Sequence, residues 1–194
     1  MSRTIEPIMR HMVPPAKREP ARKASGMEVS MKFESRNPAT GELLCVYPEH
    51  DKAETDARLQ RAWDAWRHWS RTSLAERIAF LTRLAELLEE RAETYSRLIT
   101  AEMGKPLADS IFEIKKSAWS ARHLAEAGEA YLKPQPVAGL PAQIIYESVG
   151  PIFAVMPWNV PFWQVLRFFN TTAIVGNTAL IKACRNGPGL RPGA

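Results

Sequence analysis

The chain has 194 residues, 45% of them hydrophobic and 24% charged, a composition typical of a soluble globular protein with a sizeable core. Its formal net charge of +5 comes from the two ends, since residues 1–26 carry six basic and two acidic side chains and the last twelve residues add two arginines. The body between them is close to neutral, which argues against a folded nucleic-acid-binding face. Polyanion binding through the basic ends stays a minor alternative, which strong salt dependence would reveal.

The two cysteines, Cys45 and Cys184, lie far apart and have no CxxC partner. The sequence therefore predicts no disulfide scaffold and no metal site. The unpaired cysteines also predict a reducing, cytoplasmic location. No run of about 18 apolar residues is present, so we expect no membrane span. Residues 1–30 lack the apolar segment of a secretory signal, and we expect them to form a disordered basic extension.

The first predicted elements are a strand and a helix. The turn signal "NPATG" precedes a predicted strand over residues 42–47. Apolar residues then recur every three or four positions, which predicts an amphipathic helix whose tryptophans pack in the core. This stripe consists of Leu59, Ala62, Trp63, Trp66 and Trp69.

Two further helices follow. A capping-box pattern from Ser73 to Glu76 predicts a helix that continues to Gly104. Its charged residues indicate a solvated face rather than paired catalytic carboxylates. The next helix is predicted over residues 107–129, with Gly128 and a following proline as breakers, and "AQIIYES" at residues 142–148 is strand-like. The glutamates of the solvated face are Glu86, Glu89 and Glu90.

Residues 152–182 have the pattern of a strand, a helix and a second strand. The predicted strands are 152–156 and 178–182, and the helix between them covers 162–175. Such a βαβ unit has parallel strands and a right-handed crossover, so we expect an α/β fold. After Lys182 the sequence "ACRNGPGLRPGA" has no periodicity, and a doubly wound sheet needs more strands than these.

Asn159 stands where the first of these strands ends, in "PWNVPFW". Ligands of open α/β sheets bind beyond the carboxyl ends of the strands, where an amide N–H can donate to a developing negative oxygen. Asparagine is also a preferred residue at the N-cap of a helix. The residues alone leave both interpretations open.

Five segments together resemble the amino-terminal part of the NAD(P)-dependent aldehyde dehydrogenase superfamily. In chain order they are "NPATGE", "AEMGKPLADS", "VGPIFAVMPWN", "PWNVPFWQVLR" and "GNTALIK", and the similarity runs from about Phe33 to Lys182. The resemblance implies a helical amino-terminal part and the first βαβ unit of a Rossmann-type cofactor domain, which would be incomplete. It divides the chain into the extension at 1–30, a family-like domain at 31–182 and a tail at 183–194 that a frameshift or truncation would explain.

The resemblance also implies roles for residues at the end of the first strand. In the family the asparagine of the Pro-Trp-Asn motif donates to the oxyanion formed when a catalytic cysteine attacks the aldehyde, and Asn159 matches it. Lys182 matches the lysine that reaches the adenosine ribose of NAD or NADP, and the sequence leaves the choice between the two cofactors open. The residues matching the cofactor groove are Val155, Met156, Pro157 and Trp158.

Arg167 and residues 142–148 suggest a substrate and partners. In succinate-semialdehyde dehydrogenases an arginine eight residues past the asparagine binds the substrate carboxylate, and Arg167 has this spacing. The alternative is an arginine in a pair on the helix surface. Residues 142–148 resemble the first strand of the family's oligomerisation sheet, which implies a homo- or hetero-oligomer with dehydrogenase subunits.

The family's catalytic cysteine and glutamate base belong to segments beyond position 194, and neither Cys45 nor Cys184 is expected to replace the thiol. We therefore predict a truncated aldehyde dehydrogenase-like protein that is inactive alone, whose parent activity is oxidation of succinic semialdehyde. The alternative is a non-catalytic module that docks on full-length dehydrogenase subunits or binds nucleotide weakly.

Overall fold

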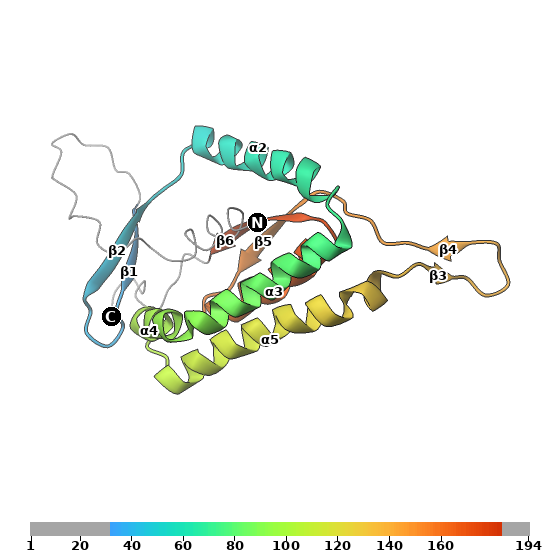
Figure 1. Ribbon diagram of the computed structural model, residues 1–194. Coiled ribbons are helices and arrows are strands. Elements are labelled where there is room, and N and C mark those ends of the chain that lie inside the picture. The colour runs from blue at the N-terminus through green and yellow to red at the C-terminus, as the bar shows by residue number, and fades with distance from the viewer. Residues whose placement is uncertain (1–31, 184–194) are drawn as a thin grey trace.

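The computed structural model describes residues 32–183 (Figure 1). The predictions for residues 1–30 and for the tail lie outside the described residues, except that Ala183 belongs to the last strand. In chain order the elements are β1 (Lys32–Arg36), β2 (Leu43–Pro48), α2 (Lys52–Trp69), α3 (Leu74–Glu90), α4 (Ala92–Met103), α5 (Leu107–Leu132), β3 (Gln135–Pro136), β4 (Gln143–Ile144), β5 (Pro151–Met156), α6 (Pro161–Ile174) and β6 (Thr178–Ala183).

β1 and β2 form an antiparallel ribbon, of which the sequence pattern predicted only the second strand. Phe33 pairs with Tyr47 and Ser35 with Cys45 in the ribbon. The turn between the strands is fixed by Asn37, whose Oδ1 accepts a hydrogen bond from the backbone N–H of Ala39 at 2.9 Å. β1 packs against α4 at the end of the molecule opposite the β3–β4 hairpin (Figure 1).

Glu102 of α4 lies under this ribbon, and burial raises its pKa above the ordinary value of 4.5, against a smaller lowering by its hydrogen bond with Ser35. Burial also raises the pKa of Tyr47, with smaller contributions from Cys45 and Glu102. Because the folded-state pKa of Glu102 is raised, its contribution to stability is complete below the pKa of the unfolded carboxyl and is lost as pH rises through the folded pKa.

We therefore expect Glu102→Gln, which cannot ionise, to be more stable than the wild type at pH 8 and equal to it near pH 4. Urea unfolding at a series of pH values measures the difference. A difference that does not change with pH would contradict this assignment of the titrating group.

α3, α4 and α5 build the main core, and Figure 1 shows α3 and α5 side by side. The capping box at Ser73 and Glu76 is confirmed. The single helix predicted from there to Gly104 is wrong, because the backbone leaves helical geometry at Arg91 (φ −108°, ψ 17°) and α4 starts in a new direction. This break lets Tyr95 of α4 face the core that α3 and α5 share. The largest fully buried apolar side chains there are Leu81, Leu84, Leu88, Tyr95, Ile99 and Ile114.

The glutamates of α3 are on its solvated face, as predicted. Arg83 pairs with Glu86 and Glu90 at 2.9 and 3.0 Å, and Glu89 pairs with Arg122 of α5 at 2.5 Å. All of these side chains are substantially exposed, so each pair contributes little to stability.

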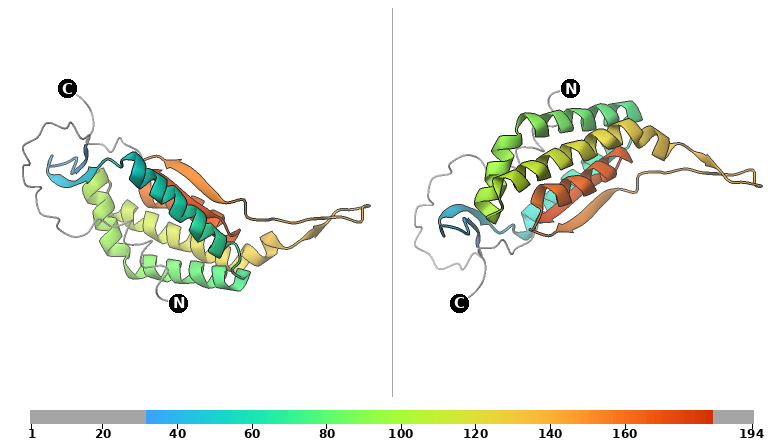
Figure 2. Two further views of the ribbon diagram at one scale, coloured as in Figure 1. Left: turned by 90° about the horizontal axis from the view of Figure 1, so that it is seen from above. Right: turned by 90° about the horizontal axis from the view of Figure 1, so that it is seen from below.

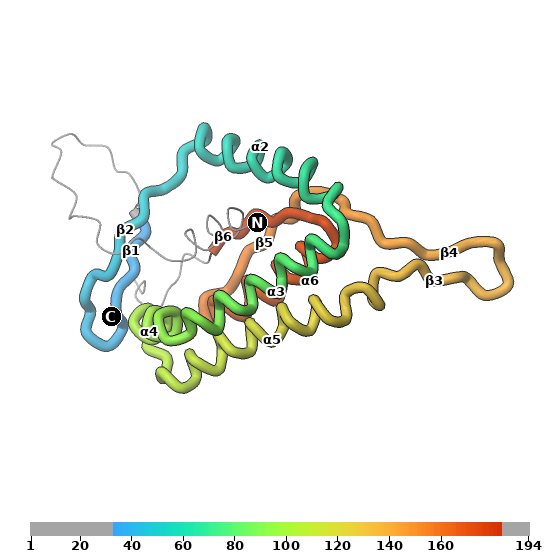
Figure 3. The backbone as a smooth tube through the Cα atoms, viewed as in Figure 1, coloured from blue at the N-terminus to red at the C-terminus, as the bar shows by residue number. Residues whose placement is uncertain are grey.

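α2 confirms the predicted amphipathic helix but only part of its predicted packing. Trp63 is 44% exposed, so the prediction that it packs in the core is wrong. Trp66 and Trp69 are half-buried, and their indole N–H groups donate to Ser148 Oγ (3.2 Å) and to the carbonyl oxygen of Ala173 (3.0 Å). The physical reason is that α2 packs mainly on β5 and β6 (Figure 3), and it meets α3 through Trp69 at its end, whose ring centroid lies 5.2 Å from that of Phe80.

α5 continues through Gly128, so the prediction of a helix break there is wrong. Gly128 is buried where α5 meets α6, and a Cβ at this position would lie 3.0 Å from Ile174 Cγ1. The glycine therefore serves close helix packing rather than helix termination.

The strand predicted over 142–148 is mostly wrong, because only Gln143 and Ile144 pair, with Gln135 and Pro136. Pro136 has no N–H to extend the ladder, and the described residues supply no third strand beside it. The hairpin projects from the body (Figures 1 and 2) and leaves Ile144, Ile145 and Tyr146 about half exposed.

The βαβ unit is confirmed. β5 and β6 are parallel, with Val155 opposite Lys182 and Met156 opposite Ala183. α6 packs on one face of this pair and on α5 (Figure 2, right). The fold is therefore α/β, as predicted, and residues 32–183 contribute a helix-rich amino-terminal part and one two-stranded parallel sheet.

Candidate functional site

The candidate site lies at the carboxyl ends of β5 and β6. Between β5 and α6, Pro157–Val160 forms a bend that carries Asn159, whose side chain is exposed. Within residues 32–183, the Asn159 side chain makes no hydrogen bond. Its amide N–H groups are therefore available to a ligand oxygen.

Asn159 does not cap α6. The N-cap residue is Val160, which makes no side-chain capping bond, and Pro161 occupies the first turn. The cap comes from α5 instead, because Glu113 Oε1 accepts the backbone N–H groups of Phe162 at 2.8 Å and Trp163 at 3.1 Å. A carboxylate in this position satisfies two free donors and interacts favourably with the helix dipole.

Lys105 completes this arrangement. Its Nζ lies 2.5 Å from Glu113 Oε2, and the glutamate side chain is only 2% exposed. Gly104 adopts a left-handed conformation (φ 66°) that ends α4 and directs the chain into Lys105 and Pro106. The "GKP" segment thus supplies the counter-charge that allows Glu113 to be buried under the start of α6.

Sequence reasoning missed Glu113. The available signal was its spacing, since it lies three positions after Ser110 and four before Ser117 on the buried side of α5. A single carboxylate on a buried helix face requires hydrogen-bond donors or a cation beside it. The sequence does not say that those donors come from a backbone some fifty residues away.

Arg167 is exposed on α6, and its Nη2 donates to Gln164 Oε1 at 3.2 Å. It has no carboxylate partner in the part of the chain that the structure describes. One turn earlier, Lys116 Nζ lies over the ring of Trp163, 4.1 Å from its centroid. Arg167 follows Trp163 by four positions and so lies on the same side of α6.

The predicted cofactor residues gather at the same edge of the sheet. Lys182 is exposed and stands opposite Val155, so the two side chains share one face of the parallel pair. Val155 is 62% and Trp158 44% exposed. An uncovered apolar surface next to an ammonium group fits an adenosine, with the base on the apolar side and a ribose hydroxyl at the lysine.

No nucleophile belongs to this edge among residues 32–183. The thiol of Cys45 lies on β2, in the separate β1–β2 ribbon, and is half-buried. That part of the chain also has no cluster of His, Cys, Asp and Glu that could hold a metal ion. Its helices are all too short or too polar to cross a bilayer.

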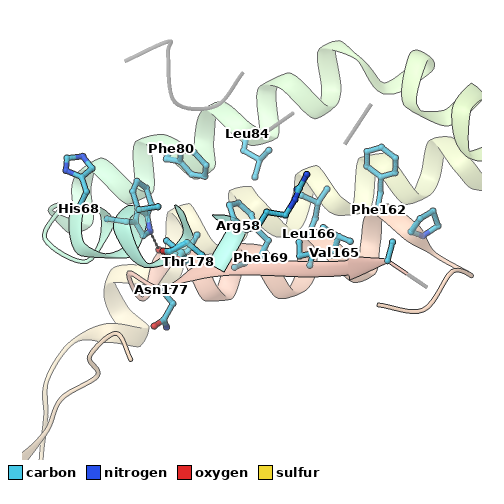
Figure 4. A pocket seen from close by; sticks show the side chains of 18 residues that line it. Arg58, His68, Phe80, Leu84, Phe162, Val165, Leu166, Phe169, Asn177 and Thr178 are labelled. Atoms are coloured by element: carbon cyan, nitrogen blue, oxygen red, sulfur yellow. Dashed lines mark hydrogen bonds between the residues drawn. The ribbon is translucent and has the colours of Figure 1, made fainter. Parts of the chain in front are cut away.

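A separate cavity of about 660 Å³ lies between α2, α3, α6 and β6, and we call it the α2–α6 groove (Figure 4). Apolar side chains such as Phe80, Leu84 and Phe169 line most of it. Asn159, Arg167 and Lys182 are not among its lining residues. The groove and the candidate site are therefore different surfaces of the same βαβ unit.

A parallel βαβ unit with polar side chains exposed at its carboxyl edge is typical of α/β proteins, whose ligands bind at the carboxyl ends of the strands. The particular family follows from comparison with known proteins. The sequence model of the protein family described as "Aldehyde dehydrogenase family" matches residues 26–190. The chain belongs to the aldehyde dehydrogenase family.

Curated relatives agree with this assignment. A probable succinate-semialdehyde dehydrogenase [NADP(+)] of Synechocystis sp. is 37% identical over 154 residues, which are 78% of this chain and 34% of the relative. A succinate-semialdehyde dehydrogenase [NADP(+)] of Deinococcus radiodurans is 37% identical over 152 residues, 77% of this chain and 32% of the relative. The chain thus spans about a third of the length of the curated relatives that it matches.

Solved structures show the same relation. The succinic semialdehyde dehydrogenase of Streptococcus pyogenes, determined in complex with NADP+, superposes with a TM-score of 0.75 and 28% identity, over 80% of this chain and 35% of that one. The succinate-semialdehyde dehydrogenase of Burkholderia pseudomallei gives a TM-score of 0.74 and 29% identity, over 82% and 34%.

Proposed function

We propose that this chain is the amino-terminal part of an NAD(P)-dependent aldehyde dehydrogenase whose substrate is succinic semialdehyde. The proposal rests on one observation: Glu113 caps α6, whereas Asn159 does not. Because Glu113 caps α6, the amide of Asn159 is not needed for the fold and stays exposed at the carboxyl end of β5.

Asn159 is proposed as the oxyanion donor. When a thiolate attacks the aldehyde carbon, negative charge develops on the carbonyl oxygen, and an N–H donor held in place lowers the energy of that state. Glu113 fixes the first turn of α6 and so limits the movement of the bend in which Asn159 lies.

Arg167 is proposed to bind the carboxylate at the other end of the substrate. Its guanidinium has no competing carboxylate partner among the described residues and presents paired N–H donors that match carboxylate geometry. The names of two relatives, succinate-semialdehyde dehydrogenases, support a substrate with such a carboxylate.

The cofactor is proposed to lie on the face of Val155 and Lys182, with Met156, Pro157 and Trp158 beside it. Bound there, NAD or NADP would supply the hydride acceptor. This chain's part is to hold the adenosine half, with Lys182 at the ribose. The relatives from Synechocystis and Deinococcus are named as NADP(+) enzymes, which favours NADP.

Without a thiol or a general base at this edge, residues 32–183 are proposed to be inactive alone, in the cytoplasm, and to work with dehydrogenase subunits. The projecting β3–β4 hairpin, with Ile144, Ile145 and Tyr146 uncovered, is the proposed contact to another subunit. The alternative proposal, a non-catalytic module that docks on full-length subunits, uses the same hairpin.

A hybrid enzyme tests this function. Residues 31–183 would be joined to the remainder of the Deinococcus relative, and nicotinamide reduction followed with succinic semialdehyde and with butanal. The hybrid is expected to oxidise succinic semialdehyde, whereas the 194-residue chain alone reduces no cofactor. Asn159→Ala should lower kcat about 10² to 10³-fold with both aldehydes. Arg167→Met should raise KM for succinic semialdehyde about 10 to 100-fold.

Butanal is the internal control, since it has no carboxylate for Arg167 to bind. Loss of activity toward both aldehydes in Arg167→Met would refute the carboxylate role. A folded hybrid without dehydrogenase activity, or turnover by the chain alone, would refute the proposed division of catalytic groups.

A further inference from the structure

Lys116 of α5 reaches across to the first turn of α6. Its Nζ lies 4.1 Å from the centroid of the Trp163 ring, and its side chain is exposed. Lys115, the preceding residue, is exposed as well but makes no such contact with a ring among the described residues. The attraction between a cation and an aromatic face therefore holds one particular ammonium group of α5 against α6.

The guanidinium group of Arg167 is directed to the same turn of α6. Residues four positions apart are neighbours on a helix surface, so Arg167 is next to Trp163 on α6. The hydrogen bond of 3.2 Å from Arg167 Nη2 to Gln164 Oε1 shows that this side chain points back toward the amino-terminal end of the helix. The cationic groups of Lys116 and Arg167 thus converge on the turn of α6 that follows the bend of Asn159.

These two cations have no carboxylate partner in the part of the chain that the structure describes. Neither Lys116 nor Arg167 takes part in an ion pair there. The acidic residue of α5 closest to Lys116 in sequence is Glu113, which is buried and paired with Lys105. Like charges repel, and an anion that binds between them relieves the repulsion. The arrangement therefore suits an anionic group of a ligand.

We propose that Lys116 is a second cation of the substrate site and that it binds the carboxylate of succinic semialdehyde together with Arg167. Lys116 takes no part in the chemistry of the aldehyde group and determines specificity instead. Its ammonium group is a single charge from α5, whereas the guanidinium group presents paired donors from α6. Two cations favour an aldehyde that carries a carboxylate over an uncharged aldehyde of the same length. The inference deepens the proposed function and rests on the role proposed there for Arg167.

Butyrate binding to the intact 194-residue chain tests this site without requiring turnover. Butyrate has the four-carbon chain and the carboxylate of the substrate, and butanamide is its uncharged counterpart. Nitrogen-15 NMR is expected to show a saturable shift of the Trp163 indole N–H with butyrate but not with butanamide. The binding should weaken as salt is added, because both cations are exposed.

Lys116→Met, which keeps the length of the side chain and removes its charge, should weaken butyrate binding about tenfold, the effect of losing one charge-assisted hydrogen bond. Lys115→Met is the matched control at the neighbouring exposed lysine, and it should change the affinity less than about twofold, since solvent screens a charge outside the site. Lys116→Arg keeps the charge and should restore most of the binding. No binding of butyrate, equal binding by the wild type and Lys116→Met, or an equal loss in Lys115→Met would each overturn the proposal.

The hybrid enzyme gives the catalytic readout, the ratio of kcat/KM for succinic semialdehyde to that for butanal. Lys116→Met should lower this ratio about tenfold, mainly through KM for succinic semialdehyde. A lowered ratio in Arg167→Met beside an unchanged ratio in Lys116→Met would refute the role of Lys116 alone. An inactive hybrid, or an unchanged ratio in Arg167→Met, would refute the proposed function, and butyrate binding by the intact chain would still decide whether Lys116 and Arg167 form a carboxylate site.

Discussion

Glu113→Ala is expected to lower the free energy of unfolding by about 3 to 5 kcal/mol, the range for removing one partner of a buried ion pair. The substitution leaves Lys105 without its carboxylate and the N–H groups of Phe162 and Trp163 without their acceptor. A buried donor that loses its partner costs about 1 to 3 kcal/mol. Urea unfolding followed by circular dichroism measures the loss as a lower midpoint at unchanged slope.

Two further variants separate the causes. Glu113→Gln keeps an oxygen acceptor for α6 but not the charge that Lys105 requires, so its loss should be smaller than that of the alanine variant. Glu129→Ala, at an exposed position of the same helix, should change stability by no more than about 0.5 kcal/mol. A Glu113→Ala variant as stable as Glu129→Ala would show that α6 does not depend on the carboxylate.

The βαβ unit could be predicted from sequence because its signals are local. An apolar run ending before Pro157, a proline at the first turn of α6 and the turn at Gly176 mark its boundaries within one or two residues of those observed. The break at Arg91 and the continuation through Gly128 could not be predicted in the same way. Both depend on which helix packs against which, and Gly128 is explained only by Ile174 beside it.

The residues of the candidate site differ in the same way, since some have local sequence signals and others depend on distant contacts. Asn159 and Arg167 could be named from a motif and its spacing. Glu113 could not, because its meaning comes from two backbone N–H groups that are distant in sequence. The exposure of Trp63 was also missed, since an amphipathic stripe predicts a buried face without saying whether a neighbour fills the space beside it.

Asn177→Ala is expected to lower the free energy of unfolding by about 2 to 3 kcal/mol, because Asn177 secures the amino-terminal end of β5. Its Oδ1 accepts the backbone N–H groups of Val149 at 2.7 Å and Gly150 at 3.0 Å, and its side chain is buried. The residue therefore ties the turn after α6 to the start of β5. Urea unfolding should report the loss, and hydrogen exchange should quicken at Gly150.

Asn159→Ala is the matched control, since the same amide is removed from an exposed position without hydrogen bonds among the described residues. It should change stability by no more than about 0.5 kcal/mol. Asn177→Asp keeps the acceptor oxygen and should recover much of the loss at neutral pH. If Asn159→Ala destabilises the chain as much as Asn177→Ala does, the amide of Asn159 serves the fold, and its assignment as an oxyanion donor loses the observation on which it rests.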